Sequence, residues 1–345
     1  MAKGEFVPES KREIARSTLV VLLLAGIAIL VALLARTLLL IFAAILIAVL
    51  IRAAGAPLRR AGLPNTPSVI LGFIGILVLL GLFGWLFGAQ LGSQLGEIYA
   101  RIPRGVELVR EWLDTTPFGG QLAEATPPLS ELAGQALSVA FGVFGVVANT
   151  ILVLIGAVYL ALHPSIYARG LARLFPKRQS ERIERALNAS GRSLRNYLLG
   201  QLLTMTIVGT LVAVGLGIVG VPSALALGVI IALANFIPLI GPFIGAVPGI
   251  LIALTAGPET ALYATGVYFV AQQLEGNVLT PLVQEWAVSI PPALLIFMLA
   301  AFGTLFGVVG VILAAPMAVV LYTMITMLWT RDTLGHDVTV PGGEA

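Results

Sequence analysis

Cysteine is absent from the sequence, and histidine occurs only at His163 and His336. The lack of cysteine excludes disulfides, thiolate metal sites and cysteine nucleophiles. Two histidines so far apart in the chain do not have the spacing of a metal site. We therefore predict no metal centre and no cofactor.

Motifs for nucleotide-driven work and for hydrolysis are also missing. The three lysines are Lys3, Lys11 and Lys177, and none of them follows a glycine-rich loop as a Walker A lysine does. ATP-driven transport by this chain alone is thereby excluded. The patterns His-Glu-x-x-His and Gly-x-Ser-x-Gly do not occur, so we predict that the chain is not an enzyme. Nucleic-acid binding is not expected either, because no basic soluble module is evident.

Charged residues are scarce and unevenly placed. They make up 11% of the 345 residues, whereas 58% of the residues are hydrophobic. Lys and Arg are missing between Arg195 and Arg331, a stretch whose acids are Glu259, Glu275 and Glu285. A water-soluble domain of this composition could not cover its apolar side chains. The sequence therefore predicts an all-α integral membrane protein.

The apolar runs predict a polytopic helical bundle with about eight membrane segments, because one crossing needs about 20 apolar residues. Residues 18–51 are too long for one crossing, so we expect a tight hairpin near Arg36. The expected order along the chain is membrane helices 1 to 3 (1–89), a polar external helical insertion (90–135), membrane helix 4 (136–162), a basic cytoplasmic segment (163–196), a C-terminal membrane core with broken hairpins (197–330) and a cytoplasmic tail (331–345).

Basic residues predict the orientation, because Lys and Arg concentrate in cytoplasmic loops. Segment 163–196 holds eight Lys or Arg and two Glu, a net charge of +6, whereas insertion 90–135 has a net charge of −3. We therefore expect the N-terminus, the loop around Arg59, the basic segment and the C-terminal tail in the cytoplasm. The basic segment could also bind anionic membrane lipid, but a role in setting topology is the simpler interpretation.

The insertion carries apolar residues at helical spacing, which favours a packed amphipathic helix. These residues are Leu91, Leu95, Ile98 and Ile102. Two explanations remain open for the apolar face. It is buried within one chain, or it packs between the subunits of a homo-oligomer.

Two stretches of the C-terminal core are interrupted by proline and glycine. The first is broken at Pro238, Gly241 and Pro242, and the second near Gly303 and Gly307, with Gly310 shortly after. Residues 222–248 and 292–316 are loosely alike, and paired broken segments of this kind indicate a transport site between repeats. We predict two broken or re-entrant hairpins. The alternative is ordinary Gly/Ala-rich helix packing, which uses the same residue types.

At these positions the sequence resembles the autoinducer-2 exporter (AI-2E) family of PerM-like bacterial permeases. The resemblance is carried by three motifs in order: Asn235-Phe-Ile-Pro238-Leu-Ile-Gly241-Pro242, Gln273-Leu-Glu275-Gly-Asn277-Val-Leu-Thr-Pro281, and Gly307-Val-Val-Gly310 leading to Pro316. It also covers the basic segment that ends in Arg195-Asn-Tyr-Leu-Leu-Gly200-Gln201. The sequence Leu282-Val-Gln284-Glu285-Trp286 departs from the residues that often follow the second motif in this family.

This resemblance implies an inner-membrane transporter. Some members of the family are assigned to export of the quorum-sensing signal autoinducer-2, and others are described as sodium/proton antiporters. Family membership therefore leaves the substrate open. As partners it implies a small polar solute and either H⁺ or Na⁺.

Glu275 is the strongest candidate for a substrate- or ion-binding residue, because acids at membrane depth are costly and usually face a partner or a water path. Gln272, Gln273 and Asn277 surround it in the sequence. The alternative is a solvated carboxylate at a helix end. Asn235 is a further candidate, where backbone groups freed by the break could bind an ion, or it simply caps the turn.

The function that these features favour is secondary transport across the bacterial inner membrane. The chain would export a small polar solute or signal molecule, coupled to protons or sodium. A Na⁺/H⁺ antiporter and a solute channel are the alternatives, since broken helices also line pores.

Overall fold

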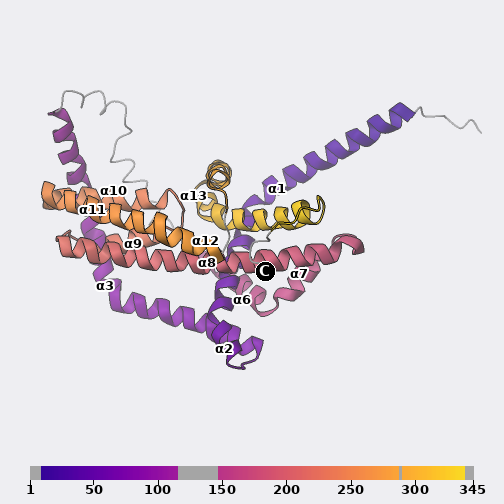
Figure 1. The fold of residues 1–345 in the computed structure, drawn as a ribbon, viewed down its shortest axis with the longest axis horizontal. Coiled ribbons are helices and arrows are strands. Elements are labelled where there is room, and N and C mark those ends of the chain that lie inside the picture. The colour runs from indigo at the N-terminus through magenta and orange to yellow at the C-terminus, as the bar shows by residue number, and fades with distance from the viewer. Residues whose placement is uncertain (1–8, 116–146, 287–289, 339–345) are drawn as a thin grey trace, which may run out of the picture.

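The structure is a computed structural model that describes residues 9–115, 147–286 and 290–338, in which every regular element is a helix (Figure 1). Within these described ranges, four helices are long and apolar enough to cross a membrane: Leu33–Ala54, Asn65–Trp112, Lys177–Val219 and Pro292–Arg331. The pair formed by α6 (Val147–Leu162) and α7 (Pro164–Ala172), bent by 87°, would make a fifth. The described residues are thus all-helical, and the chain is a multi-pass membrane protein.

The first helix differs from the prediction. α1 (Glu9–Ala54) runs through Arg36 without a break, so the predicted hairpin there is wrong. Proline and glycine are missing from residues 27–54, which are rich in the helix formers Leu and Ala. A helix of 46 residues is about 69 Å long, more than a bilayer core requires. A single membrane crossing by this helix would put the N-terminal charges and Arg59 on opposite sides, which conflicts with the expectation that both are cytoplasmic.

A short helix, α2 (Ala56–Arg60), leads to α3 (Asn65–Asp114), which continues from the predicted third span into the insertion. Only 11% of the most apolar part of α3 is buried within the chain, as expected for a helix that faces lipid. Figure 1 shows α3 bending and crossing the ends of α10 and α11. There Ile98 and Ile102 are buried, and Leu91 and Leu95 pack against the same cluster, on the face that their spacing indicates. Residues 116–135 of the insertion lie outside the described residues.

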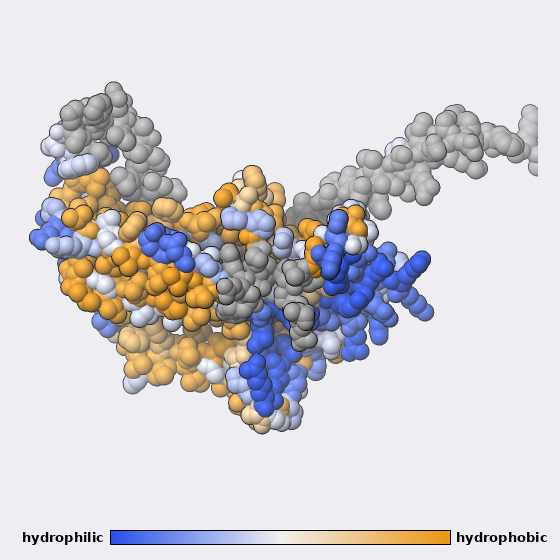
Figure 2. Space-filling model, viewed as in Figure 1, coloured by the Kyte–Doolittle hydropathy of each residue, from blue (hydrophilic) through white to orange (hydrophobic). Residues whose placement is uncertain are grey.

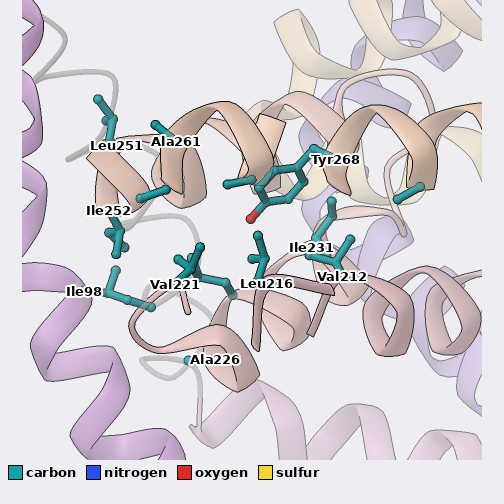
Figure 3. Packing of buried hydrophobic residues seen from close by; sticks show 14 of the residues in the cluster. Ile98, Val212, Leu216, Val221, Ala226, Ile231, Leu251, Ile252, Ala261 and Tyr268 are labelled. Carbon is teal, nitrogen blue, oxygen red and sulfur yellow. The ribbon is translucent and has the colours of Figure 1, made fainter. Parts of the chain in front are cut away.

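Four helices form the largest packed cluster: α8 (Lys177–Val219), α9 (Ala224–Ala234), α10 (Gly241–Ala256) and α11 (Pro258–Leu274). Figure 3 shows Leu216 of α8, Ile231 of α9, Ile252 of α10 and Tyr268 of α11 pointing into one interior. Ile98 of α3 closes one side of it. After α11 the chain forms η2 (Glu275–Leu279), α12 (Thr280–Trp286), α13 (Pro292–Ile325) and η3 (Thr326–Arg331).

The basic segments gather at one end of the molecule. Arg52 Nη1 donates a 2.9 Å hydrogen bond to Ala161 O, and Asn65 Nδ2 donates a 3.0 Å bond to Leu162 O, so the α2 loop lies against the α6–α7 junction. Met327 of η3 is buried with Ala186 and Ala189 of α8, which brings the C-terminal end of the chain to the same side. Figure 2 separates this hydrophilic end from the hydrophobic surface over α3, α10 and α11.

Candidate functional site

The first predicted break lies between α9 and α10. The helix ends at Ala234, and α10 begins at Gly241 with Pro242 in its first turn, where a missing N–H costs nothing. Leu239 has a φ of 70°, a left-handed conformation that is uncommon for leucine. Gly241 N donates to Ile237 O at 2.9 Å and closes the turn. The two helices therefore form a hairpin around a strained turn.

Glycine lets the two arms of this hairpin approach each other. A Cβ added at Gly241 would lie 2.9 Å from Asn235 Cα and would overlap the backbone carbonyl of Ala234. Those neighbours are backbone atoms, which cannot rotate away as a side chain can. Any residue larger than glycine at position 241 would therefore push α9 and α10 apart.

The second predicted break lies inside α13. Gly307 has φ 62° and ψ −148°, a non-helical conformation that divides the helix into residues 292–306 and 308–325. A Cβ added at Gly310 would lie 2.8 Å from the backbone carbonyl carbon of Phe302, and one at Gly303 would lie 3.0 Å from Val311 Cγ2. The segment after the break thus folds back against the segment before it.

The two broken segments contact each other. Ile237, in the turn of the first hairpin, is buried with Leu299 and Ala314 of α13. Its neighbour Phe236 packs with Phe306 and Leu313 in an adjoining cluster. A movement of either hairpin would therefore change the packing contacts at the turn of the other.

Asn235 and Glu275 meet beside the first turn. Asn235 Nδ2 donates a 2.9 Å hydrogen bond to Glu275 Oε2, although 40 residues separate them in the chain. Asn235 is only 1% exposed, and its backbone carbonyl accepts a hydrogen bond from Gln201 Nε2 of α8. Its Oδ1 atom is buried and has no hydrogen-bond partner among the described residues. Residues of α8 and η2 thus meet at Asn235, which follows the end of α9.

Glu275 begins the π-helical turn η2, where Thr280 N donates to Glu275 O. Pro281 explains this wider turn, because proline has no N–H for the carbonyl of Asn277, its usual α-helical partner. π-Helical turns are rare and occur often at functional sites. The local sequence therefore sets both the position of the carboxylate and the widening of the helix that carries it.

The amides predicted to surround Glu275 are not all on its side of the helix. Gln272, three residues earlier, lines the same cavity as Glu275. Gln273 and Asn277 are exposed and do not line it. The ion pairs found in the described part of the chain are Arg101–Glu97 and Arg331–Asp332. No basic side chain of the described residues therefore pairs with the carboxylate of Glu275.

The cavity beside Glu275 has a volume of about 320 Å³ and is lined by α8, α9, α10 and α11. Thr265, Tyr268, Gln272 and Glu275 line it from α11 and the start of η2, at spacings of three or four residues. Thr265 and Tyr268 are not among the predicted site residues, although their helical spacing upstream of Glu275 is visible in the sequence. The rest of the lining is Val208, Ile231, Pro242, Phe243, Ala246, Val247, Ile250, Phe269 and Ala271.

A second polar cluster, which the sequence does not predict, joins the start of α9 to α3. Ser223, with φ 60°, donates from Oγ to Glu97 Oε2 at 2.8 Å, and Arg101 donates to Glu97 Oε1 at 2.7 Å. Gln94 Oε1 accepts a 2.9 Å hydrogen bond from the N–H of Ala226 at the start of α9. No motif connects α3 with α9 in the sequence, so these partners emerge only from the fold.

Comparison with known proteins agrees with this architecture. The chain is 28% identical over 273 residues to YueF of Bacillus subtilis, which bears the name of a candidate transport protein, and the match covers 74% of each chain. It is 30% identical over 271 residues to the similarly named MT0215 of Mycobacterium tuberculosis, covering 75% of this chain and 74% of that protein. The model of the AI-2E family transporters matches residues 18–329. The matched residues include both broken hairpins and Glu275, and the chain belongs to the AI-2E transporter family.

Proposed function

We propose that the chain is a secondary transporter in which Glu275 and Asn235 form the site that couples solute movement to a cation, H⁺ or Na⁺. The observation that carries this proposal is the hydrogen bond from Asn235 Nδ2 to Glu275 Oε2. It joins the turn of a broken hairpin to the π-helical turn that bears the carboxylate. In transporters, broken helices of this kind bind solutes and ions and move during the cycle.

The unsatisfied atoms of the pair support a cation site. Asn235 Oδ1 is a buried acceptor without a described partner, and the carboxylate of Glu275 has no described cation beside it. Burying an uncompensated charge is costly, and buried acceptors normally find a donor. A proton on Glu275 would neutralise the carboxylate, and it would be donated to Asn235 Oδ1 only after the side-chain amide flips. A cation shared by the carboxylate and Asn235 Oδ1 would satisfy both groups.

Coupling follows from the position of Asn235. The residue lies at the start of the turn whose next residues, Phe236 and Ile237, pack on α13. A proton on Glu275 removes its charge and weakens the charge-assisted hydrogen bond from Asn235. Binding and release of the proton or cation at Glu275 would then shift the packing of both hairpins. A carrier needs such a conformational change in each cycle, whereas an open channel does not.

The arrangement of the basic segments supports an orientation. The α2 loop, the segment around α7 and the end of η3 lie at one end, which we assign to the cytoplasm of a cell with this protein in its inner membrane. The polar cluster of Glu97, Arg101 and Ser223 then lies toward the outer side. Export of a small solute or signal molecule, autoinducer-2 being the example that the family suggests, would run between these two ends.

Transport in proteoliposomes tests this proposal. The full chain is reconstituted, and accumulation of autoinducer-2 and of a panel of small solutes is measured with and without a pH or Na⁺ gradient. Glu275→Gln keeps the shape of the side chain but cannot titrate, so we expect exchange to persist and gradient-driven accumulation to be lost. Glu259→Gln is the matched control, because Glu259 is exposed at the other end of α11. Gradient-driven accumulation that survives in Glu275→Gln would contradict the proposal.

A further inference from the structure

The cavity beside Glu275 has the wrong lining for a small polar solute. Its walls are mostly hydrocarbon and aromatic, and the hydroxyl of Thr265 is already bonded to Ala261 O at 2.8 Å. Glu275 and Gln272 supply polar side chains to the lining, and the hydroxyl of Tyr268, another lining residue, is buried and has no hydrogen-bond partner among the described residues. A solute rich in hydroxyl groups would lose hydrogen bonds to water there without replacing them.

The same lining suits a different chemistry. The carboxylate of Glu275 has no described cation beside it. The rings of Phe243 and Phe269 border the same space, and aromatic faces attract organic cations. Val247 and Ile250 add apolar surface. A volume of about 320 Å³ falls at the lower end of the range for sites that hold drug-sized ligands.

We propose that this cavity binds an amphipathic organic cation, with its positive group beside Glu275 and its apolar body between Phe243, Phe269 and Val247. The inference deepens the proposed function, on which it rests, by naming the substrate class of the same site. It replaces the small polar solute that the sequence suggested. A proton and the organic cation would then compete for one carboxylate.

The surroundings of the cavity fit a ligand that arrives from the bilayer. Phe243 is 73% exposed and Phe269 is 64% exposed. Phe243 belongs to α10 and Phe269 to α11, the helices over which Figure 2 shows a hydrophobic surface. An amphipathic cation concentrates in the interfacial region of a membrane, so it would reach the cavity without crossing the aqueous phase.

Equilibrium binding tests the inference with two probes of the same shape and opposite charge, radiolabelled tetraphenylphosphonium and tetraphenylborate. The full-length protein is held in nanodiscs, and binding to empty nanodiscs is subtracted. We expect saturable binding of the phosphonium, weakened about tenfold or more by Glu275→Gln, because a charge-assisted contact is lost. The borate should show no saturable binding.

Two further variants separate the cavity from the carboxylate. Val247→Trp fills the cavity from a partly exposed position and leaves Glu275 intact, so it should weaken phosphonium binding by about tenfold as well. Phe297→Ala is the control, because Phe297 on α13 is 72% exposed, about as much as Phe243, but does not line the cavity. This substitution should leave phosphonium binding unchanged.

The outcomes distinguish this inference from the proposed function. Equal binding of both probes, or phosphonium binding that ignores Glu275→Gln and Val247→Trp, would show that the cavity takes apolar molecules such as lipid chains, and would overturn the inference. No phosphonium binding, together with Glu275-dependent accumulation of another solute, would overturn the inference and keep the proposed function. Glu275-dependent binding without any Glu275-dependent transport would overturn the proposed function and leave a cation-binding site.

Discussion

The two broken hairpins are built alike in their backbones and differ in their polar groups. In each, a glycine lies where an added Cβ would overlap the opposite arm: Gly241 against Ala234, and Gly310 against Phe302. The first hairpin carries the buried Asn235, whose side chain donates a hydrogen bond to Glu275 of η2. The second has Thr304 near its break, and that hydroxyl is exposed and bonded to Ala301 O of its own helix. Close packing is therefore shared, whereas the buried hydrogen bond between an amide and a carboxylate is found at the first hairpin.

The shared packing predicts the largest effect. Gly241→Val and Gly310→Val should each abolish transport, because a branched side chain must displace backbone atoms at a cost of about 3 kcal/mol. The measurement is solute exchange in proteoliposomes, with membrane insertion checked separately. Gly266→Val on α11 is the control, since a Cβ there meets nothing within 4 Å. If one hairpin tolerates valine, the two backbones do not have the same role.

The difference in polar groups predicts the next effect. Asn235→Ala should reduce gradient-driven transport about tenfold, because Glu275 loses a hydrogen bond worth about 1.5 kcal/mol. Thr304→Ala at the second break should change transport less than about twofold, since its hydroxyl bonds within its own helix. The ratio of the two initial rates is the quantity to measure. Equal losses would mean that the second hairpin also has a polar function.

The outer end of the first hairpin predicts a smaller effect on stability. Ser223→Ala removes the hydrogen bond from Ser223 Oγ to Glu97 Oε2 and should lower the thermal midpoint of the purified protein by a few degrees. Arg101→Gln should lower it less, because the Arg101–Glu97 pair is exposed and solvent screens it. A midpoint that rises in Ser223→Ala would show that the hydrogen bond stores strain at this left-handed residue.

The orientation of the protein in the membrane can be tested by labelling, without a transport measurement. Single cysteines at Ser180 and Thr115 in this cysteine-free chain should react with an impermeant thiol reagent from opposite sides of the membrane. Reaction of both cysteines from the same side would contradict the assignment of these two ends to opposite sides of the membrane.

The features that could be predicted from the sequence are those set by local chemistry. Proline and glycine predict both breaks, because each residue type changes the backbone at its own position. Charge scarcity predicts the membrane, and the cost of a buried acid singles out Glu275. The hairpin near Arg36 was predicted from length alone, and length cannot distinguish two short helices from one helix that extends beyond the bilayer.

Features that depend on contacts between residues far apart in the chain could not be predicted from the sequence. The bond between Asn235 and Glu275 spans 40 residues, and that between Ser223 and Glu97 spans 126. Each residue was visible in the sequence, and Asn235 and Glu275 were both singled out, but nothing in the chain pairs them. The apolar cavity was hidden for the same reason, since four helices contribute to its walls.

Glu275 has no basic side chain of the described residues beside it, and this determines how much charge a transport cycle would move. A single carboxylate that releases one proton as it accepts one monovalent cation carries the same net charge in both loaded forms. If both forms cross, each cycle moves one positive charge in each direction, and the membrane voltage does no net work on it. Such an exchanger would respond to a pH difference and ignore an imposed potassium-diffusion potential. Current recordings on supported membranes would then stay flat while solute accumulates.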